Sequence, residues 1–226
     1  MSFPRLSRLR SLPPTACLLA KAALVAVACL LATATLLINV ATLGAAAPAP
    51  ASTGPLVGQL LVAAPTIGDP RFDHAVILLV RQDKSGAFGI IINRPLEKRS
   101  IKSLLEAAGD RAPGVEGSLE VFAGGPVQPE LGFVVHSADY HDPDTLAVGP
   151  GLAVTADKQV LRDIGHHLGP KQSLFAFGYA GWGPGQLEGE IARRDWFTAT
   201  GDPKLIFDDD RGDLWRDATA RRTREL

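Results

Sequence analysis

The main body of this sequence lacks cysteine. The chain of 226 residues contains two cysteines, Cys17 and Cys29, and both lie within the first fifty residues. From residue 51 onward the chain therefore offers no disulfide, no thiolate metal site and no cysteine nucleophile. Such a composition is compatible with an oxidising compartment.

The body also lacks an excess of positive charge. The first fifty residues carry four of the 23 basic side chains and none of the 24 acidic ones, so residues 51–226 have a net charge of −5. Non-specific binding to nucleic acid depends on basic side chains that neutralise phosphates. We therefore do not expect nucleic acid as a partner.

Motifs for phosphate binding and for serine catalysis are missing as well. The stretch FGYAGWGPGQLEGEIARRDW, residues 177–196, contains closely spaced glycines, but Gln186 stands where G-x-G-x-x-G requires glycine and no G-K-[ST] follows. Glu188 and Glu190 fall in the first turns of the helix expected there, where they would repel phosphate. Ser137 lies outside any G-x-S-x-G motif. We predict no catalytic residue and no cofactor.

Residues 1–50 form a separate unit in the sequence. Three arginines in the first ten residues precede an uncharged apolar stretch, Ala22–Leu43, and an Ala/Pro-rich end with A-x-A patterns follows. This order predicts a signal peptide or a membrane anchor with an Ala/Pro-rich linker, and membrane contact through residues 18–43 if it is not cleaved. The body would then be exported to the periplasm or held at the inner membrane. The alternative is a cytosolic product whose translation starts near Val57.

Residues 51–226 are expected to form one domain. Apolar, β-branched runs on either side of a D-K-S-G turn predict a hairpin over residues 74–93, and further strands are expected within 118–137 and 173–180. Helices are expected to start at Ser100, at Thr155, whose helix would turn Leu168 inward, and near Gly185. The segment KLIFD, residues 204–208, is expected as a last strand, with a terminal helix after it. This alternation favours an α+β fold with a mainly antiparallel, barrel-like sheet flanked by helices.

Four stretches together resemble the YqgE/AlgH family of bacterial proteins (UPF0301). They are GQLLVAAPTIGDPRFDHAVILLVRQDKSGAFGIIINRPL, VFAGGPVQPELGFVVHS, FGYAGWGPGQLEGEIARRDW and LIFDDDRGDLW, spread in the family's order over residues 58–215. The resemblance implies a compact α+β domain with a bifurcated sheet around a small barrel and no established reaction. It links the chain to proteins associated with regulation of gene expression, alginate production among them. Members are ordinarily cytosolic and begin near the position of Leu56, so the first fifty residues depart from the pattern.

The glycine-rich corner and the helix after it are the strongest candidate for a functional surface. Trp182 is expected to be a large buried anchor, with Leu187 on the core face of the helix. Gln186 and Glu190 share another face with Arg194, and we expect that face to be solvated with a Glu190–Arg194 pair; a polar wall of a groove is the alternative. The candidate binding surface comprises Asn93, His136, Trp182, Gln186 and Glu190.

A second set of residues is expected to shape the backbone. Proline, glycine and Asp-Pro build turns, and glycine lets the chain turn sharply and approach other backbone closely. The residues with this predicted role are Pro65, Asp69, Pro70, Pro95, Gly124, Gly125, Pro126, Gly178, Gly181 and Gly185. The His- and Asp-rich loop over residues 136–144 fits no metal-ligand spacing, so we expect a solvated loop and no metal.

These observations favour a non-enzymatic binding or regulatory protein that affects gene expression indirectly through an unidentified protein or small molecule. One alternative is a hydrolase that uses His136 with Glu190 or a loop metal. Another, tied to a cytosolic start near Val57, is a DNA-binding transcriptional regulator.

Overall fold

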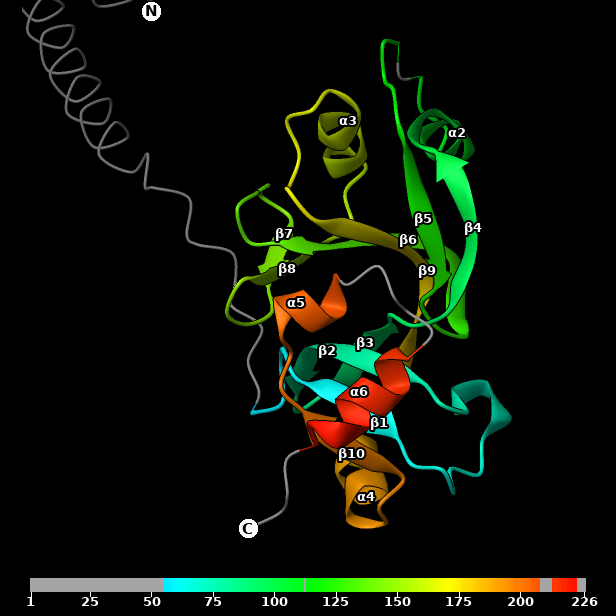
Figure 1. Ribbon diagram of the computed structural model, residues 1–226, viewed down its shortest axis with the longest axis vertical. Helices are drawn as coiled ribbons and strands as arrows, with labels where there is room; N and C mark the ends of the chain where they lie inside the picture. The colour runs from blue at the N-terminus through cyan, green and yellow to red at the C-terminus, as the bar shows by residue number, and fades with distance from the viewer. Residues whose placement is uncertain (1–54, 112, 208–212, 223–226) are drawn as a thin grey trace, which may run out of the picture. The chain divides into compact units, whose positions relative to one another are not determined.

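A computed structural model describes residues 55–111, 113–207 and 213–222 of the chain (Figure 1). Over these residues, ten strands and five α-helices form an α+β domain, which confirms the expected fold class. The strands are β1 (Leu60–Ala63), β2 (Val76–Asp83), β3 (Gly86–Ile91), β4 (Pro95–Ser100), β5 (Ser118–Ala123), β6 (Val127–Ser137), β7 (Thr145–Ala147), β8 (Leu152–Thr155), β9 (Ser173–Trp182) and β10 (Trp196–Ala199). The helices are η1, a 3₁₀ turn (Pro70–Phe72), α2 (Ile101–Ala107), α3 (Gln159–Gly165), α4 (Gln186–Ala192), α5 (Pro203–Ile206) and α6 (Leu214–Ala220).

The strands form a curled, half-barrel sheet in the order β10-β1-β2-β3-β9-β6-β8-β7. Every pairing along this path is antiparallel, as expected. Strand β9 lies where the sheet forks. Its last residues, Ala180–Trp182, pair with β3, whereas Phe175–Phe177 pair in parallel with β5, which in turn holds β4.

The central strands are buried on both faces. Leu60 and Leu78 pack into one cluster of core side chains, while their neighbours Leu61 and Ile77 pack into another. Successive side chains of a strand point to opposite faces, so the continuous apolar runs of β1 and β2 reflect this two-sided burial. Helix α6 packs against β1, α4 lies beside β10, and α2 and α3 lie at the far end of the domain from α4 (Figure 1).

Close backbone packing explains two of the predicted glycine positions. At Gly125 an added Cβ would stand 2.1 Å from the carbonyl carbon of Tyr179, and at Gly178 it would stand 2.5 Å from the carbonyl oxygen of Gly125. Gly178 also has φ +71°, which L side chains rarely adopt. The corner between β5 and β6 can therefore cross β9 at this distance only because both positions are glycine.

Several local predictions were wrong. Thr155 does not start a helix: it is buried at the end of β8, and α3 begins at Gln159. Leu168 is 73% exposed, because α3 ends at Gly165 before reaching it. The expected strand at KLIFD is instead α5, since Asp202 accepts a hydrogen bond from the Lys204 amide and Pro203 occupies the first helical position.

Strands β4, β7, β8 and β10 were not expected. Strands β7, β8 and β10 have only three or four residues each, and β4 has the composition of a polar loop because most of its side chains are exposed.

The predicted signal peptide or anchor in residues 1–50 lies outside the described residues. Among the helices of the described ranges, none is long and apolar enough to cross a membrane.

Candidate functional site

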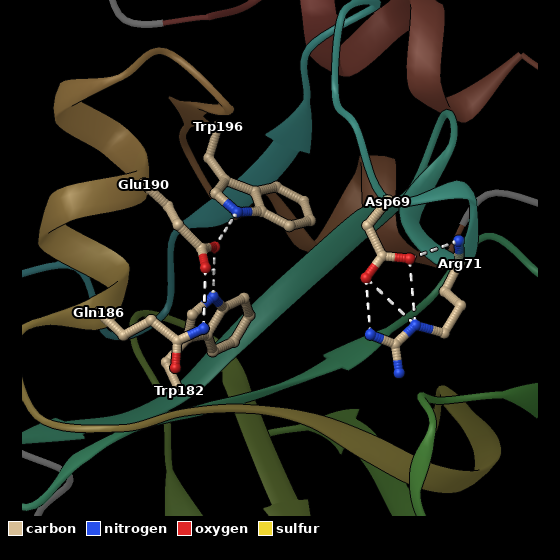
Figure 2. Close-up of polar contacts among 6 residues, drawn as sticks. All are labelled: Asp69, Arg71, Trp182, Gln186, Glu190 and Trp196. Carbon is tan, nitrogen blue, oxygen red and sulfur yellow. Dashed lines mark hydrogen bonds and ion pairs between the residues drawn. The ribbon is translucent and has the colours of Figure 1, made fainter.

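A groove of about 450 Å³ lies between helix α4 and the turn at η1 (Figure 2). We call it the indole groove. Its walls include Asp69, Arg71, Trp182, Gln186, Glu190 and Trp196. It therefore combines the glycine-rich corner with a loop that lies more than a hundred residues earlier in the sequence.

Glu190 is the central polar group of the groove. Its Oε2 accepts hydrogen bonds from the indole Nε1–H groups of Trp182 and Trp196, each at 2.8 Å. Its Oε1 accepts a third bond, 2.8 Å long, from the side-chain amide of Gln186 (Figure 2). A buried indole N–H needs an acceptor, so one carboxylate satisfies two large aromatic anchors at once.

The glycine-rich corner positions this carboxylate. Gly185 adopts a left-handed conformation, φ +72°, immediately before α4 begins. Gln186 folds back to accept the backbone N–H of Gly183 at 3.0 Å, and Leu187 is fully buried beneath the helix. The corner thus fixes the start of α4, and one helical turn later Glu190 points at the indoles.

The opposite wall carries a tightly held ion pair. Arg71 approaches Asp69 through two guanidinium nitrogens, with the shortest contact, Nη2 to Oδ2, at 2.6 Å (Figure 2). The Arg71 backbone N–H also donates to Asp69 Oδ1 at 2.9 Å, which caps η1. Hydrogen bonds from the Arg71 side chain, and to a smaller extent from the Arg71 backbone N–H, hold the pKa of Asp69 below its ordinary value.

The charges of the groove do not balance. Arg71 is paired with Asp69, and Arg193 with Asp195 at 2.9 Å. Glu190 is the remaining charged residue of the lining, and its hydrogen bonds come from neutral donors. The groove therefore holds one carboxylate that no cation neutralises among the described residues.

The predicted binding surface is only partly assembled. Trp182, Gln186 and Glu190 meet in the indole groove. The face of α4 that carries Gln186 and Glu190 therefore forms a wall of a groove, which was the alternative to the expected solvated face. The expected Glu190–Arg194 pair is absent from the described part of the chain, because Glu190 turns toward the indoles and Arg194 has left the helix with φ +66°.

Asn93 does not join the groove. Its side chain accepts from the Val76 backbone N–H at 2.9 Å and donates to the His74 carbonyl at 2.8 Å. These two hydrogen bonds connect the segment after β3 to the start of β2 and the loop before it.

His136 is not a surface residue, which corrects its place in the predicted binding surface. It is fully buried, with Nδ1 2.9 Å from the carbonyl oxygen of Ser137 and Nε2 2.9 Å from the hydroxyl of Thr155. The Thr155 hydroxyl in turn contacts that of Thr145 at 2.7 Å. Burial lowers the pKa of His136 from its ordinary value. Both ring nitrogens are thus engaged away from Glu190, which removes the His136–Glu190 pairing on which one form of the hydrolase hypothesis depended.

The remaining predicted structural residues lie at turns and strand ends. Pro95 opens β4, and Pro126 follows the corner between β5 and β6 and also lines the indole groove. Pro65 follows directly after β1 and Ala64, and Pro70 opens η1 behind its cap Asp69.

Gly124 and Gly181 belong to the same region of the fold. An added Cβ at Gly124 would stand 2.4 Å from the carbonyl oxygen of Gly178, whereas Gly181 is exposed on the groove lining. Within the described ranges, no group of three or more His, Cys, Asp or Glu side chains is arranged to hold a metal ion.

Two groove residues were missed by the sequence analysis. The first is Arg71, which belongs to no motif; its partner Asp69 was expected only to build a turn. The second is Trp196, which lies four residues after the end of α4. The one signal in the sequence that could have indicated it is its closeness to Trp182. Its ring meets Phe72 edge to face at 5.5 Å, which joins the two walls of the groove.

The fold and the groove define a small α+β half-barrel domain with a ligand-sized groove beside α4. A model of the AlgH-like family, DUF179, matches residues 60–226. The chain therefore belongs to the AlgH-like UPF0301 family, which confirms the resemblance seen in the sequence.

Relatives and solved structures agree with this assignment. A UPF0301 protein of Jannaschia sp. is 45% identical over 161 residues, 70% of this chain and 84% of its own, and one of Sphingopyxis alaskensis is 42% identical over 165 residues, 72% and 87%. The solution structure of AlgH from Pseudomonas aeruginosa has a TM-score of 0.63 at 35% identity, covering 75% of this chain and 90% of that one. The crystal structure of DIP2367 from Corynebacterium diphtheriae, 24% identical with a TM-score of 0.59 over 76% and 89%, shares the fold.

Proposed function

We propose that this protein is a non-enzymatic binding module whose indole groove accepts a cationic group, the ammonium or guanidinium of a partner's side chain. The observation that carries the proposal is the unneutralised carboxylate of Glu190. Two indole N–H groups and one amide hold it in place, so its direction is fixed before a ligand arrives.

Charge complementarity supports a cation over an anion. Both cations of the groove lining are already paired with aspartates, whereas Glu190 lacks such a partner there. A cation beside Glu190 would meet a carboxylate, and a charge-assisted hydrogen bond to a carboxylate is among the stronger polar contacts in proteins. An anion would meet like charge within the same groove.

The described residues assemble no coherent catalytic set, which favours binding over turnover. The hydrolase alternative needed His136 with either Glu190 or a loop metal. His136 instead contacts Ser137 and Thr155, and among the described residues no group of three or more His, Cys, Asp or Glu side chains is arranged to hold a metal ion. The DNA-binding alternative needs a basic surface, and the body carries a net charge of −5. A regulatory role would then act through the bound partner.

A titration tests this proposal. N-acetyl-lysine methylamide is added to the full-length chain while its tryptophan fluorescence is recorded, and N-acetyl-norleucine methylamide serves as the neutral ligand of similar shape. We expect a Kd on the order of 1 mM for the lysine compound and binding at least about tenfold weaker for norleucine.

Variants locate the effect in the groove. Glu190→Gln keeps an oxygen that can accept from both indoles but removes the charge, so it should weaken lysine binding about tenfold. Glu97→Gln, at an exposed carboxylate on β4, is the matched control and should bind as the wild type does. Equal affinity for lysine and norleucine, or no effect of Glu190→Gln, would contradict the proposal.

We also propose that the body is exported or held at the inner membrane through residues 1–50. The proposal rests on the order of the basic, apolar and Ala/Pro-rich segments. Fractionating cells that express the native gene and sequencing the mature N-terminus tests it. A first residue near Ala49 indicates cleavage and Met1 in the membrane fraction indicates an anchor, whereas a cytosolic product starting near Val57 contradicts export.

A further inference from the structure

We infer that the cation at Glu190 belongs to a short extended peptide, and that this peptide pairs with the backbone of Gly181 at an open edge of β9. The inference rests on the proposed function and adds the kind of ligand and the way it is held. Three features of the described residues carry it: the register of β9, the direction of the Gly181 backbone groups and a second cavity beside the indole groove.

Strand β9 has an open edge where it passes the groove. Its pairing with β6 extends only as far as Tyr179, which lies opposite Val127. On its other side β9 continues to pair with β3 through Ala180–Trp182. In the described part of the chain, no strand therefore covers Gly181 and Trp182 on the side away from β3, and an unpaired edge is a template for an added strand.

The backbone of Gly181 is directed toward this open side. An added Cβ at Gly86, in β3, would stand 2.2 Å from the carbonyl oxygen of Trp182, so that carbonyl faces β3. Backbone groups of successive residues in a strand point to opposite sides. The N–H and C=O of Gly181 therefore point away from β3, and Gly181 itself is exposed.

A second cavity meets the groove at this edge, on the opposite face of β9. It has a volume of about 520 Å³ and shares Val127, Gly181 and Trp182 with the indole groove. Phe88, Phe133 and Tyr179 line it, with neighbouring ring centroids 5.7–6.2 Å apart. These side chains favour an aromatic or apolar group.

These features define a ligand of three residues. Its central residue exchanges two hydrogen bonds with Gly181, so its side chain lies on the face of the sheet that carries Phe88 and Tyr179. The residue on either side of it turns its side chain to the opposite face, which carries Trp182. The basic side chain, at a flanking position, lies at Glu190, and the aromatic one, at the central position, lies among Phe88, Phe133 and Tyr179. An added Cβ at Gly181 would stand 3.3 Å from the Tyr179 ring, so a side chain there would take up space in the second cavity, which gives glycine a role beyond shaping a turn.

The test uses defined tripeptides on the full-length chain. Acetyl-Lys-Phe-Ala-methylamide and acetyl-Ala-Phe-Lys-methylamide cover both strand directions, and each is compared with its form carrying N-methyl-phenylalanine at the centre. We expect one of the two orders to bind at least about tenfold more tightly than N-acetyl-lysine methylamide. N-methylation should weaken that peptide about fivefold or more, because it removes the N–H that bonds to Gly181.

The outcomes separate this inference from the proposed function. If both tripeptides bind no more tightly than N-acetyl-lysine methylamide, or if N-methylation has no effect, while Glu190→Gln still weakens lysine binding, the peptide inference is wrong and the cation site stands. If Glu190→Gln leaves the binding of every lysine compound unchanged, the proposed function itself is wrong and the inference falls with it.

Discussion

The indole ring of Trp196 meets that of Trp182 edge to face, with ring centroids 5.9 Å apart and planes at 82°. Trp182 ends β9 and Trp196 begins β10, so this contact closes the segment that contains α4. Because both indole N–H groups donate to Glu190, the two rings and the carboxylate form one unit. The same unit serves packing and, in the account proposed above, recognition of a cation.

Removing the Glu190 carboxylate should destabilise the fold. Glu190→Ala leaves two buried indole N–H groups without their acceptor, and we expect a loss of about 2 kcal/mol in the free energy of unfolding. Glu190→Gln should cost less than Glu190→Ala, because one amide oxygen can accept from both indoles and only the bond from the Gln186 amide is lost. Urea unfolding measures both values. Glu97→Ala, at a side chain 66% exposed, is the control and should change stability by less than about 0.5 kcal/mol. Equal losses for Ala at the two sites would contradict this assignment.

The buried imidazole of His136 should make stability depend on pH. Burial lowers its pKa in the folded state below the ordinary value of 6.5. As pH falls through 6.5, His136 becomes protonated in the unfolded chain but stays neutral in the folded chain. The free energy of unfolding therefore decreases until the pH reaches the pKa of His136 in the folded state. Above about pH 7.5 this effect is absent.

Comparison with His136→Gln isolates this contribution. Urea midpoints at pH 8, 7, 6 and 5 should fall more steeply for the wild type than for the variant. Parallel curves would show that His136 does not titrate differently in the folded and unfolded chains.

The crossing of the β5–β6 corner over β9 should tolerate no side chain. Gly125→Ala would place a Cβ 2.1 Å from the Tyr179 backbone, and we expect a loss above about 3 kcal/mol or failure to fold. Gly68→Ala, where an added Cβ meets nothing within 4 Å, should change stability by less than about 0.5 kcal/mol. Thermal unfolding followed by circular dichroism compares them. A stable Gly125→Ala protein would mean that the corner packs less closely than described here.

Asp69→Asn should weaken cation binding without unfolding the protein. The substitution frees Arg71 and removes one negative charge from the groove, whereas asparagine can still cap η1. We expect the Kd for N-acetyl-lysine methylamide to rise about threefold at low salt and less at 0.5 M salt, because screening reduces both attraction and repulsion. Asp144→Asn, the same charge change on an exposed loop, should leave the Kd unchanged. A similar rise in both variants would point to net charge and not to the groove.

The parts of the fold set by local chemistry could be predicted from the sequence. Ser100 caps α2 through its hydroxyl, with the Ser103 N–H 3.1 Å away, and the glycine corner does lead directly into a helix. Trp182 is buried as expected. The cap and the corner each depend on residues within a few positions of one another, and the burial of Trp182 follows from the large apolar surface of its side chain.

The rest depends on contacts between distant segments. Asp69 and Arg71 reach the groove only because the sheet brings η1 beside α4, and no local pattern encodes that approach. His136 was expected to lie on the surface at the end of a strand, because its partners Thr155 and Thr145 lie on two short strands that were not expected. Strand β10 was not predicted for a related reason. It has only four residues, and its pairing with β1, which is distant in the sequence, stabilises it.

The most direct test of the central claim is to observe the indole N–H groups by ¹⁵N-edited NMR during addition of N-acetyl-lysine methylamide. The signals of Trp182 and Trp196 should shift together and saturate with one Kd, because both donate to the carboxylate that would bind the cation. Trp215 is an internal reference, since its N–H donates to the Ala63 carbonyl at 2.9 Å, and its signal should stay fixed. Unchanged Trp182 and Trp196 signals, or equal shifts with N-acetyl-norleucine methylamide, would contradict a cation site at Glu190.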